Sequence, residues 1–482
     1  MARPSRYKTV LPTLKKIEEF DKEKTIQFDT DIEWLKANPV KIFKEDDYFS
    51  FELEDRAHKR IELANDDLDK GFSKNTLIGD SNNYSCLQYG LQQTQHPLAQ
   101  RKITGKLNSL LEGTVSDFDD TFLRLVQPIK KGYSKCGNFT GAIDLNTDQK
   151  VMYGVGVLRI VIDDLNFDIL RISSRKKGGK KDKEFILIDS TSKVSLDRFQ
   201  LVIEAFFKAY GFIFGTLCGG SSYVISASSE EFTNIDRILF NRRPKEQIHK
   251  NYIFDSMEIR SGKFSDSYFL FPSEVLTNMC NKILREEKFE RTIRVMHEAN
   301  MNKYSLSTAI LFSAALESIS SLIPTAKTAT DAVEREKFEK SEILAQLTKA
   351  IMQNNHLSES DKEFLINKKL RNINKPTNTN KLESPFTYYH IKLPEKFQKA
   401  LKYRDRYLHG SIPKGNKLGS FRDDDINRSL ELQFIVNILI LKYVGYSGFL
   451  KNRSIEMEYY TQKNQGKTDD EIVLDQSLYY KI

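Results

Sequence analysis

Two residues near the C-terminal end of the chain have side chains suited to phosphodiester cleavage. Residues 402–411 read K-Y-R-D-R-Y-L-H-G-S, in which Arg404 and His409 stand five positions apart and Asp405 follows the arginine. A histidine can move a proton near neutral pH, and a guanidinium can hold a phosphate by two parallel hydrogen bonds. Asp405 precedes His409 by four residues, a spacing at which side chains on one helix touch, so it can orient the imidazole. This pattern predicts phosphate chemistry.

The flanking residues predict that a helix carries this stretch. Pro394 suits a first helical turn, residues 395–408 contain no further proline or glycine, and Gly410 is the residue type expected just past a helix end. His409 should therefore lie in the last turn. Five residues turn a helix by about 140°, so Arg404 and His409 do not share one face. One copy of each makes a sparse site, whereas two copies facing each other across a dimer axis would make a full one.

The motif also carries a family resemblance. Arg404-Asp405-x-x-x-His409 matches the R-[polar]-x3-H pattern of the HEPN superfamily, small helical bundles that often act as metal-independent RNases. The longer string from Tyr403 to Gly410, followed by a long apolar helix, is most similar to the ApeA-like branch of bacterial anti-phage HEPN proteins. The resemblance implies that His409 moves protons at the ribose 2′-OH and the leaving 5′-oxygen, that Arg404 stabilises the phosphorane and that Asp405 orients the pair.

Basic and aromatic residues around the motif favour RNA as the partner. Cations attract phosphates, and aromatic rings stack on unpaired bases, so we expect single-stranded or looped RNA. Tyr403 and Tyr407 are equally suited to packing inside the protein. For the whole motif, the non-functional alternative is a surface helix on which charged residues cluster by chance. The candidate RNA-binding residues are Lys402, Tyr403, Arg406, Tyr407, Lys414 and Lys417.

Composition places the chain among ordinary cytoplasmic proteins of two or three domains. It has 482 residues, 39% hydrophobic and 29% charged, with a net charge of +8 that permits a polyanionic partner without requiring one. The four cysteines are scattered, which argues against a disulfide framework or a zinc site. Residues 1–16 lack the apolar core of a secretory signal. The most apolar run, 199–218, carries Gln200, Glu204 and Lys208 on one face, which predicts a buried helix rather than a membrane span.

The N-terminal half is predicted to be β-rich. From 153 to 188 apolar residues alternate with a period of two, and Asp163–Asn166 provides a turn, so this segment reads as a hairpin followed by a strand at 185–189. A helix should follow, beginning at Ser195. Residues 1–50 read as an irregular arm or an edge strand, and 75–95 as a loop.

The C-terminal half is predicted to be a helical bundle. Helical periodicity runs through 286–300, 305–323, 331–352, 361–373, the Arg404 segment and 424–442, with loops at 374–390 and 412–420 and an exposed tail at 453–482. Glu317 is the single acid in the apolar 305–323 helix, and we expect it to bind a partner on a neighbouring helix or, alternatively, to face the active cleft. The last helix is too apolar for one buried stripe, and its surplus could pack across a dimer interface.

Other motifs lack the context that their chemistry needs. Asp117-Phe-Asp119-Asp-Thr121 spells the D-x-D-x-T of haloacid-dehalogenase-like phosphatases, but no buried apolar strand precedes it, and we interpret these acids as the start of a helix at Phe122. The loops at 178–181 and 415–420 do not form a P-loop. His297-Glu298 lacks the second histidine of H-E-x-x-H, so no metal site or cofactor is expected.

These observations together predict an α+β protein with an N-terminal recognition or regulatory domain (1–275), an all-α HEPN-type domain (285–452) and a tail (453–482). The resemblance implies a cytoplasmic, metal-independent endoribonuclease that acts in anti-phage defence by abortive infection. It would cut RNA, with tRNA as the favoured class, to 2′,3′-cyclic phosphate and 5′-OH ends. We expect a homodimer through the C-terminal domain and a phage-derived molecule as candidate trigger. The competing class is a non-catalytic HEPN module that dimerises or binds nucleic acid in a regulatory or toxin–antitoxin complex.

Overall fold

The chain folds into two units, Met1–Ile293 and Arg294–Ile482, and the division falls within helix α8 (Glu287–Met301). The first unit contains a large sheet and the second is mainly helical, which confirms the α+β class. The computed structural model describes residues 10–26, 28–29, 39–54, 77–79, 84–94, 102–129, 140–144, 157–175, 181–244, 247–248, 251–254, 271–302, 306–324, 342–370, 378–408, 423–474 and 477–482.

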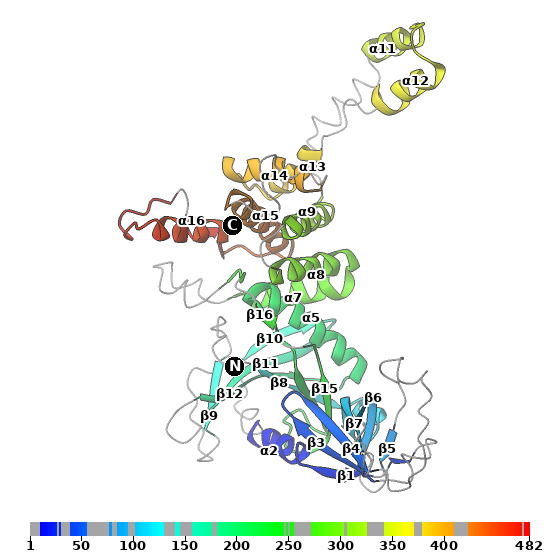
Figure 1. Ribbon diagram of the computed structural model, residues 1–482, viewed down its shortest axis with the longest axis vertical. Helices are drawn as coiled ribbons and strands as arrows, with labels where there is room; N and C mark the ends of the chain where they lie inside the picture. The colour runs from blue at the N-terminus through cyan, green and yellow to red at the C-terminus, as the bar shows by residue number, and fades with distance from the viewer. Residues whose placement is uncertain are drawn as a thin grey trace. The chain divides into compact units, whose positions relative to one another are not determined.

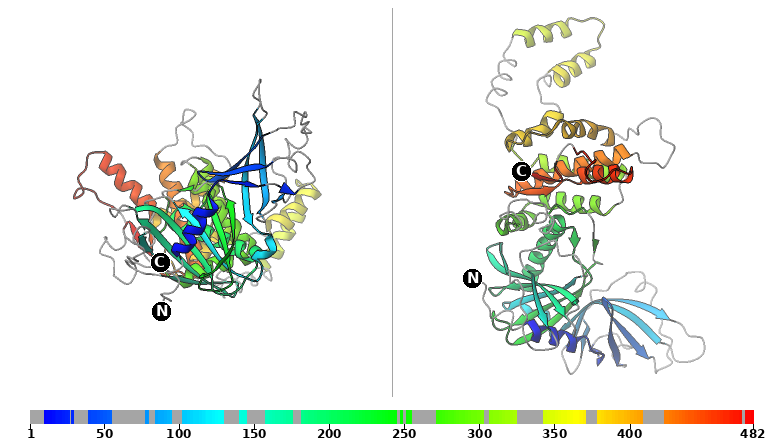
Figure 2. Two further views of the ribbon diagram at one scale, coloured as in Figure 1. Left: turned by 90° about the horizontal axis from the view of Figure 1, so that it is seen from below. Right: turned by 90° about the vertical axis from the view of Figure 1, so that its left-hand side faces the viewer.

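A 14-stranded sheet forms the first unit, and its strands fan out in Figures 1 and 2. Neighbouring strands are antiparallel, except that β9 runs parallel to β11. The main path runs in the order β1 (Lys24–Ile26), β3 (Val40–Glu45), β4 (Tyr48–Glu54), β7 (Lys102–Glu112), β15 (Ile235–Arg242), β14 (Ser221–Ala227), β8 (Phe122–Ile129), β12 (Lys181–Ser190), β11 (Leu165–Arg175) and β10 (Leu158–Ile162). Strands β2 (Phe28–Asp29), β5 (Leu77–Gly79), β6 (Tyr84–Thr94) and β9 (Thr140–Asp144) pair beside this path, and β13 (Thr216–Leu217) pairs separately with β16 (Gln247–Ile248).

The predicted hairpin is confirmed as β10 and β11. Their register pairs Ile162 with Leu165 across the turn, and β12 continues the sheet at the predicted third strand. Along β10, Leu158, Ile160 and Ile162 are buried while the residues between them are more exposed. The alternation of apolar residues along β10 therefore indicates that one face of the strand packs on the core.

Two helices cover opposite faces of this sheet. Helix α2 (Val10–Phe20) packs its apolar stripe against the face that carries Val126, Leu170 and Leu187. Helix α5 (Leu196–Phe214) lies on the other face, where Phe199 contacts Phe167 with ring centroids 6.1 Å apart. It begins after Ser195, as predicted, and ends at Gly215, whose φ of 73° suits glycine. None of the described helices is long and apolar enough to cross a membrane.

A row of four charged residues crosses the sheet beneath α2. Arg124 on β8 stands opposite Asp189 on β12, which stands opposite Asp168 on β11, which stands opposite Arg159 on β10. Arg124 Nε donates to Asp189 at 2.8 Å and Arg159 Nε donates to Asp168 at 2.7 Å. Arg124 Nη1 also donates to Thr13 of α2 at 2.8 Å. Each buried carboxylate therefore has a guanidinium partner, the condition under which buried charge is tolerated.

Helix α7 (Ser273–Arg285) covers the edge strand β10. Asn281 Nδ2 donates to the Val161 carbonyl at 2.8 Å, and its Oδ1 accepts the Asp163 amide at 2.8 Å. Thr277 Oγ1 accepts the Val161 amide at 3.3 Å. These side chains satisfy main-chain groups that an edge strand leaves open. Because α7 packs on β10 and α5, it belongs to the first unit, which extends to Ile293.

Three predictions for the first unit were wrong. Residues 10–20 form α2 rather than an irregular arm, although β1 is the expected edge strand. The predicted loop at 75–95 contains β6, whose partner β7 supplies its hydrogen bonds. Phe122 begins strand β8 rather than a helix. Asp117 lies in a short 3₁₀ turn, Val115–Phe118, and Asp119 and Asp120 follow that turn.

Helix α15 (Asp423–Tyr443) is the central helix of the second unit, and it packs against α9 (Leu306–Ser320), α14 (Glu395–Leu408) and α16 (Arg453–Asn464). Its segment 429–441 is buried within one chain. The apolar surplus that suggested a dimer interface is therefore covered by helices of the same chain. The other helical segments are α11 (Glu342–Met352), α12 (Glu359–Phe364), the π-helical turn η3 (Leu365–Lys369) and α13 (Asn378–Tyr388).

Two further predictions were wrong in this unit. The expected loop at 374–390 contains α13, which accommodates Pro385 and buries Leu382 and Phe386. The expected tail folds: α16 packs on α15, and β18 (Tyr479–Lys481) pairs with β17 (Phe449–Lys451). Residues 331–341 and 412–420 lie outside the described part of the chain.

Candidate functional site

Helix α14 positions Arg404 on its buried side. Pro394 precedes the helix, and its carbonyl accepts the amides of Phe397 and Gln398 at 3.0 and 3.2 Å. Phe397, Ala400, Leu401 and Arg404 are all buried, which is the spacing of one helical face. The predicted helix is thereby confirmed from Glu395 to Leu408, and Arg404 belongs to the stripe that packs into the bundle.

Arg404 is ion-paired with Glu317 of α9, through Nη2 and Oε1. The Arg404 side chain is 5% exposed, whereas the Glu317 side chain is 50% exposed. The expectation that Glu317 binds a partner on a neighbouring helix is confirmed, and the partner is the candidate catalytic arginine. The guanidinium is therefore not presented to solvent but is held by a carboxylate at the surface of the unit.

Tyr403 packs against a second guanidinium, that of Arg428 on α15. The Arg428 guanidinium carbon lies 3.4 Å from the centre of the Tyr403 ring. A cation over an aromatic face is attracted by the ring quadrupole. This contact favours the packing interpretation of Tyr403, and it brings Arg428, which the sequence patterns did not single out, next to the α14 segment.

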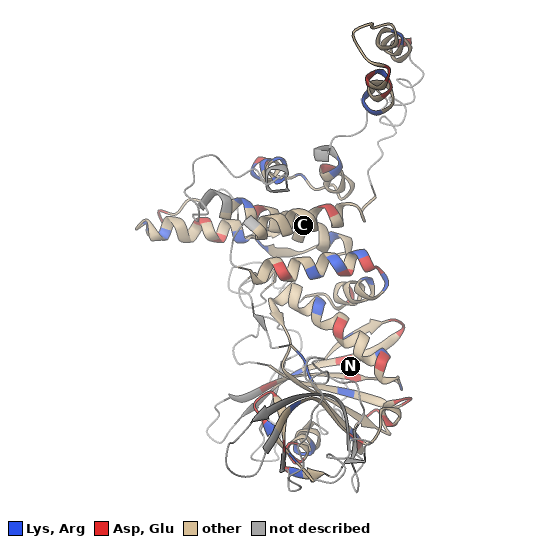
Figure 3. Ribbon diagram, turned by 45° about the vertical axis from the view of Figure 1, so that its right-hand side comes forward, with Lys and Arg blue, Asp and Glu red and all other residues tan. Residues whose placement is uncertain are grey.

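Other lysines of α14 are engaged with acids. Lys396 Nζ lies 3.1 Å from Glu458 of α16 and 3.7 Å from Glu431 of α15, and Lys399 pairs with Glu395 at 2.8 Å. Burial raises the pKa of the Glu431 carboxyl to about 7, against the opposing effect of Lys396 and Arg428. Lys402 is exposed. Figure 3 shows basic and acidic residues mixed along the helices, and Lys396 and Lys399 of α14 each lie beside an acid.

The remaining predicted residues are placed only in part. Asp405, Arg406 and Tyr407 belong to α14, but their side chains are outside the described part of the structure. His409, Lys414 and Lys417 also lie outside the described residues. The structure therefore places the first half of the motif, Lys402, Tyr403 and Arg404, on helix α14 of the bundle.

The alternative chemical motifs are structural where they are described. Asp117 Oδ2 accepts the Thr114 amide at 2.8 Å, and Asp119 Oδ1 accepts the Leu196 amide at the start of α5 at 3.4 Å. Both carboxylates thus bind main-chain groups, and the phosphatase motif does not form a phosphate site. His297 is buried. Within the described ranges, no three His, Cys, Asp or Glu residues are grouped so as to hold a metal ion.

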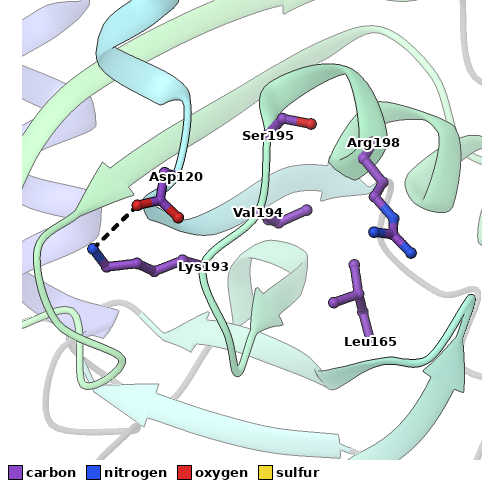
Figure 4. Close-up of a pocket in the computed structure, with 6 residues that line it drawn as sticks. All are labelled: Asp120, Leu165, Lys193, Val194, Ser195 and Arg198. Atoms are coloured by element: carbon purple, nitrogen blue, oxygen red, sulfur yellow. Dashed lines mark ion pairs between the residues drawn. The ribbon is translucent and has the colours of Figure 1, made fainter.

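An open pocket of about 290 Å³ lies at the start of α5 (Figure 4). Lys193 lies 3.5 Å from Asp120, and Arg198 lies 2.6 Å from Asp163. Because both cations already have carboxylate partners, the pocket offers little attraction to an anion. Sequence reasoning did not find this pocket, since only the fold brings its lining together: Asp120, Leu165, Lys193, Val194, Ser195 and Arg198.

The ion pair between α9 and α14 is the described feature closest to the predicted chemistry. It joins a single acid in an apolar helix to the arginine of the motif. Comparisons with models of protein families, with curated proteins and with solved structures find no match to this chain.

Proposed function

We propose that the chain is a metal-independent endoribonuclease of the HEPN type. The observation that carries the proposal is the position of Arg404 in α14, a helix that packs between α9 and α15 and whose described part ends at Leu408, the residue before His409. Arg404 precedes this histidine by five residues, and two copies of the pair facing each other in a dimer would suit phosphodiester cleavage. The proposal includes abortive infection in anti-phage defence in the cytoplasm, with tRNA as the favoured substrate.

The proposed mechanism needs only side-chain chemistry. His409 takes the proton of the ribose 2′-OH, and a histidine of the same site returns a proton to the leaving 5′-oxygen. Arg404 stabilises the negative charge that develops on the phosphorane. The 2′-oxygen attacks the phosphorus and the 5′-oxygen leaves, which gives a 2′,3′-cyclic phosphate and a 5′-OH. DNA lacks the nucleophile and should not be cut.

The burial of Arg404 favours a second candidate function. An arginine that is 5% exposed and paired with Glu317 is suited to holding α14 against α9. In that case the second unit would be a non-catalytic module that dimerises or binds nucleic acid. The two candidates differ in one outcome, which is whether RNA is cut.

Incubation with total bacterial RNA in EDTA tests the proposal. Wild type should make discrete cuts with cyclic-phosphate ends, and His409→Ala should reduce the rate by roughly a hundredfold or more, because general acid–base catalysis contributes about 10²–10⁴-fold. EDTA should leave the rate unchanged. Loss of cutting in EDTA would overturn the metal-free mechanism. RNA binding without cutting, in extracts from infected and from uninfected cells alike, would favour the non-catalytic module.

A further inference from the structure

The ion pair between Arg404 and Glu317 is unequal in its exposure. The guanidinium is almost fully covered, whereas half of the Glu317 side chain reaches solvent. Glu317 can therefore turn toward solvent, whereas the Arg404 guanidinium is covered by its neighbours. Removing the carboxylate that faces a buried guanidinium is unfavourable unless another negative group takes its place. A negatively charged group is therefore favoured over a neutral one at the place that Glu317 occupies.

We propose that the Glu317 carboxylate occupies the position at which Arg404 binds a substrate phosphate, so that RNA must displace Glu317 before it is held. This inference rests on the proposed function, and it deepens that function by assigning a restraint to the site. A carboxylate and a phosphate both present two oxygens to a guanidinium, so one can replace the other. The resting chain would accordingly bind RNA more weakly than its arginine allows.

A second observation on α9 supports an anion at this place. Ser320 lies three residues after Glu317, on the same side of the helix, and it is 9% exposed. Its Oγ has no hydrogen-bond partner among the described residues. A buried hydroxyl without a partner is costly, and a phosphate oxygen would accept its hydrogen bond. Arg404 would then donate a charged hydrogen bond to the bound phosphate, and Ser320 would donate a neutral one.

The substitution Glu317→Gln tests the restraint directly. Glutamine has nearly the same shape and can still accept a hydrogen bond from Arg404, but it lacks the charge. The probe is a fluorescent single-stranded oligoribonucleotide with 2′-O-methyl sugars, which the proposed chemistry cannot cut, and the readout is anisotropy. We expect Glu317→Gln to bind this probe roughly five- to tenfold more tightly than wild type. A change of this size is typical when one contact, here the Glu317 ion pair, competes with the binding of a ligand.

The matched control is Glu298→Gln, which removes the same charge from an exposed position on α8 in the same unit. It should change probe affinity by less than about twofold, the size of a general electrostatic effect. A double variant, Glu317→Gln with Arg404→Gln, should not bind the probe more tightly than wild type, because the increase in affinity requires the Arg404 guanidinium. Equal affinities of Glu317→Gln and Glu298→Gln would overturn the proposal.

Folding and catalysis are read separately in the same experiment. Thermal unfolding shows whether Glu317→Gln is folded, and Glu317→Ala, a truncation at a half-exposed position, provides a second variant with the same expected gain. If wild type cuts RNA but neither variant binds more tightly, the restraint is wrong and the nuclease stands. If the variants bind more tightly but no protein cuts RNA, the restraint stands and the nuclease is wrong.

Discussion

Glu431 is a carboxyl buried between the helices of the second unit, and its protonation should make stability depend on pH. Burial raises the pKa from 4.5 to about 7, with Glu458 adding to the rise and Lys396 and Arg428 opposing it. The unfolded chain releases this proton near pH 4.5 and the folded chain near pH 7. Because the folded state binds the proton more tightly, its stability falls as pH rises through this window.

Replacing Glu431 by glutamine should remove that dependence. Urea unfolding of Glu431→Gln at pH 8 should give a free energy of unfolding higher than that of wild type by about 1–3 kcal/mol, and the difference should vanish near pH 4.5. Lys396 keeps Glu458 as a partner, at 3.1 Å, so the substitution leaves that cation paired. A constant difference between the two proteins from pH 4.5 to 8 would contradict a raised pKa at this carboxyl.

At the scale of elements, Asn281 connects α7 to the edge of the sheet through both ends of its amide. Asn281→Ala should leave the Val161 carbonyl and the Asp163 amide without these partners. We expect the free energy of unfolding to fall by about 1–3 kcal/mol, and aggregation to rise because an open edge strand recruits other strands. Urea unfolding and light scattering measure the two effects. Asn234→Ala, at an exposed position in the same unit, is the control and should change neither.

Elements with a strong local pattern could be predicted from the sequence, and those that depend on distant partners could not. The hairpin of β10 and β11 and helix α5 follow from periodicity and from the turn or cap beside them. Strand β6 is rich in glutamine and lacks alternation, so only its pairing with β7 defines it. Pro385 made the segment of helix α13 resemble a loop in the sequence. Strand β18 depends on its pairing with β17, which precedes it by more than a helix in the chain.

For the candidate site, the motif and its helix could be predicted from the sequence, but the pairing of side chains between helices could not. The motif and its helix could be read directly, and a single acid in an apolar helix indicated that Glu317 needs a cation. Which cation it binds depends on how α9 packs against α14, and sequence spacing carries no information on that. The contact of Arg428 with Tyr403 is likewise a product of helix packing. Because the partner of Glu317 is Arg404, the arginine of the motif is a buried, ion-paired group.

At the scale of the whole molecule, the spacing of the motif still argues for a dimer. Arg404 and His409 are five residues apart, so on one helix their side chains diverge by about 140°. We therefore expect a full site, with both groups on one phosphate, to draw on a second copy. The apolar surplus of α15 no longer supports this, because residues 429–441 are buried within one chain. The dimer must therefore be tested by its consequence for activity rather than inferred from that helix.

A composite site makes activity depend on protein concentration. The cleavage rate per chain should rise with concentration and then level off, since by mass action only the dimer contains a full site. Sedimentation velocity over the same range should show the dimer mass appearing at the concentration where the rate levels off. Mixing an excess of His409→Ala with wild type should lower the rate per wild-type chain, because mixed dimers carry a single intact histidine. A rate per chain that is constant while the protein sediments as a monomer would show that one Arg404 and one His409 suffice.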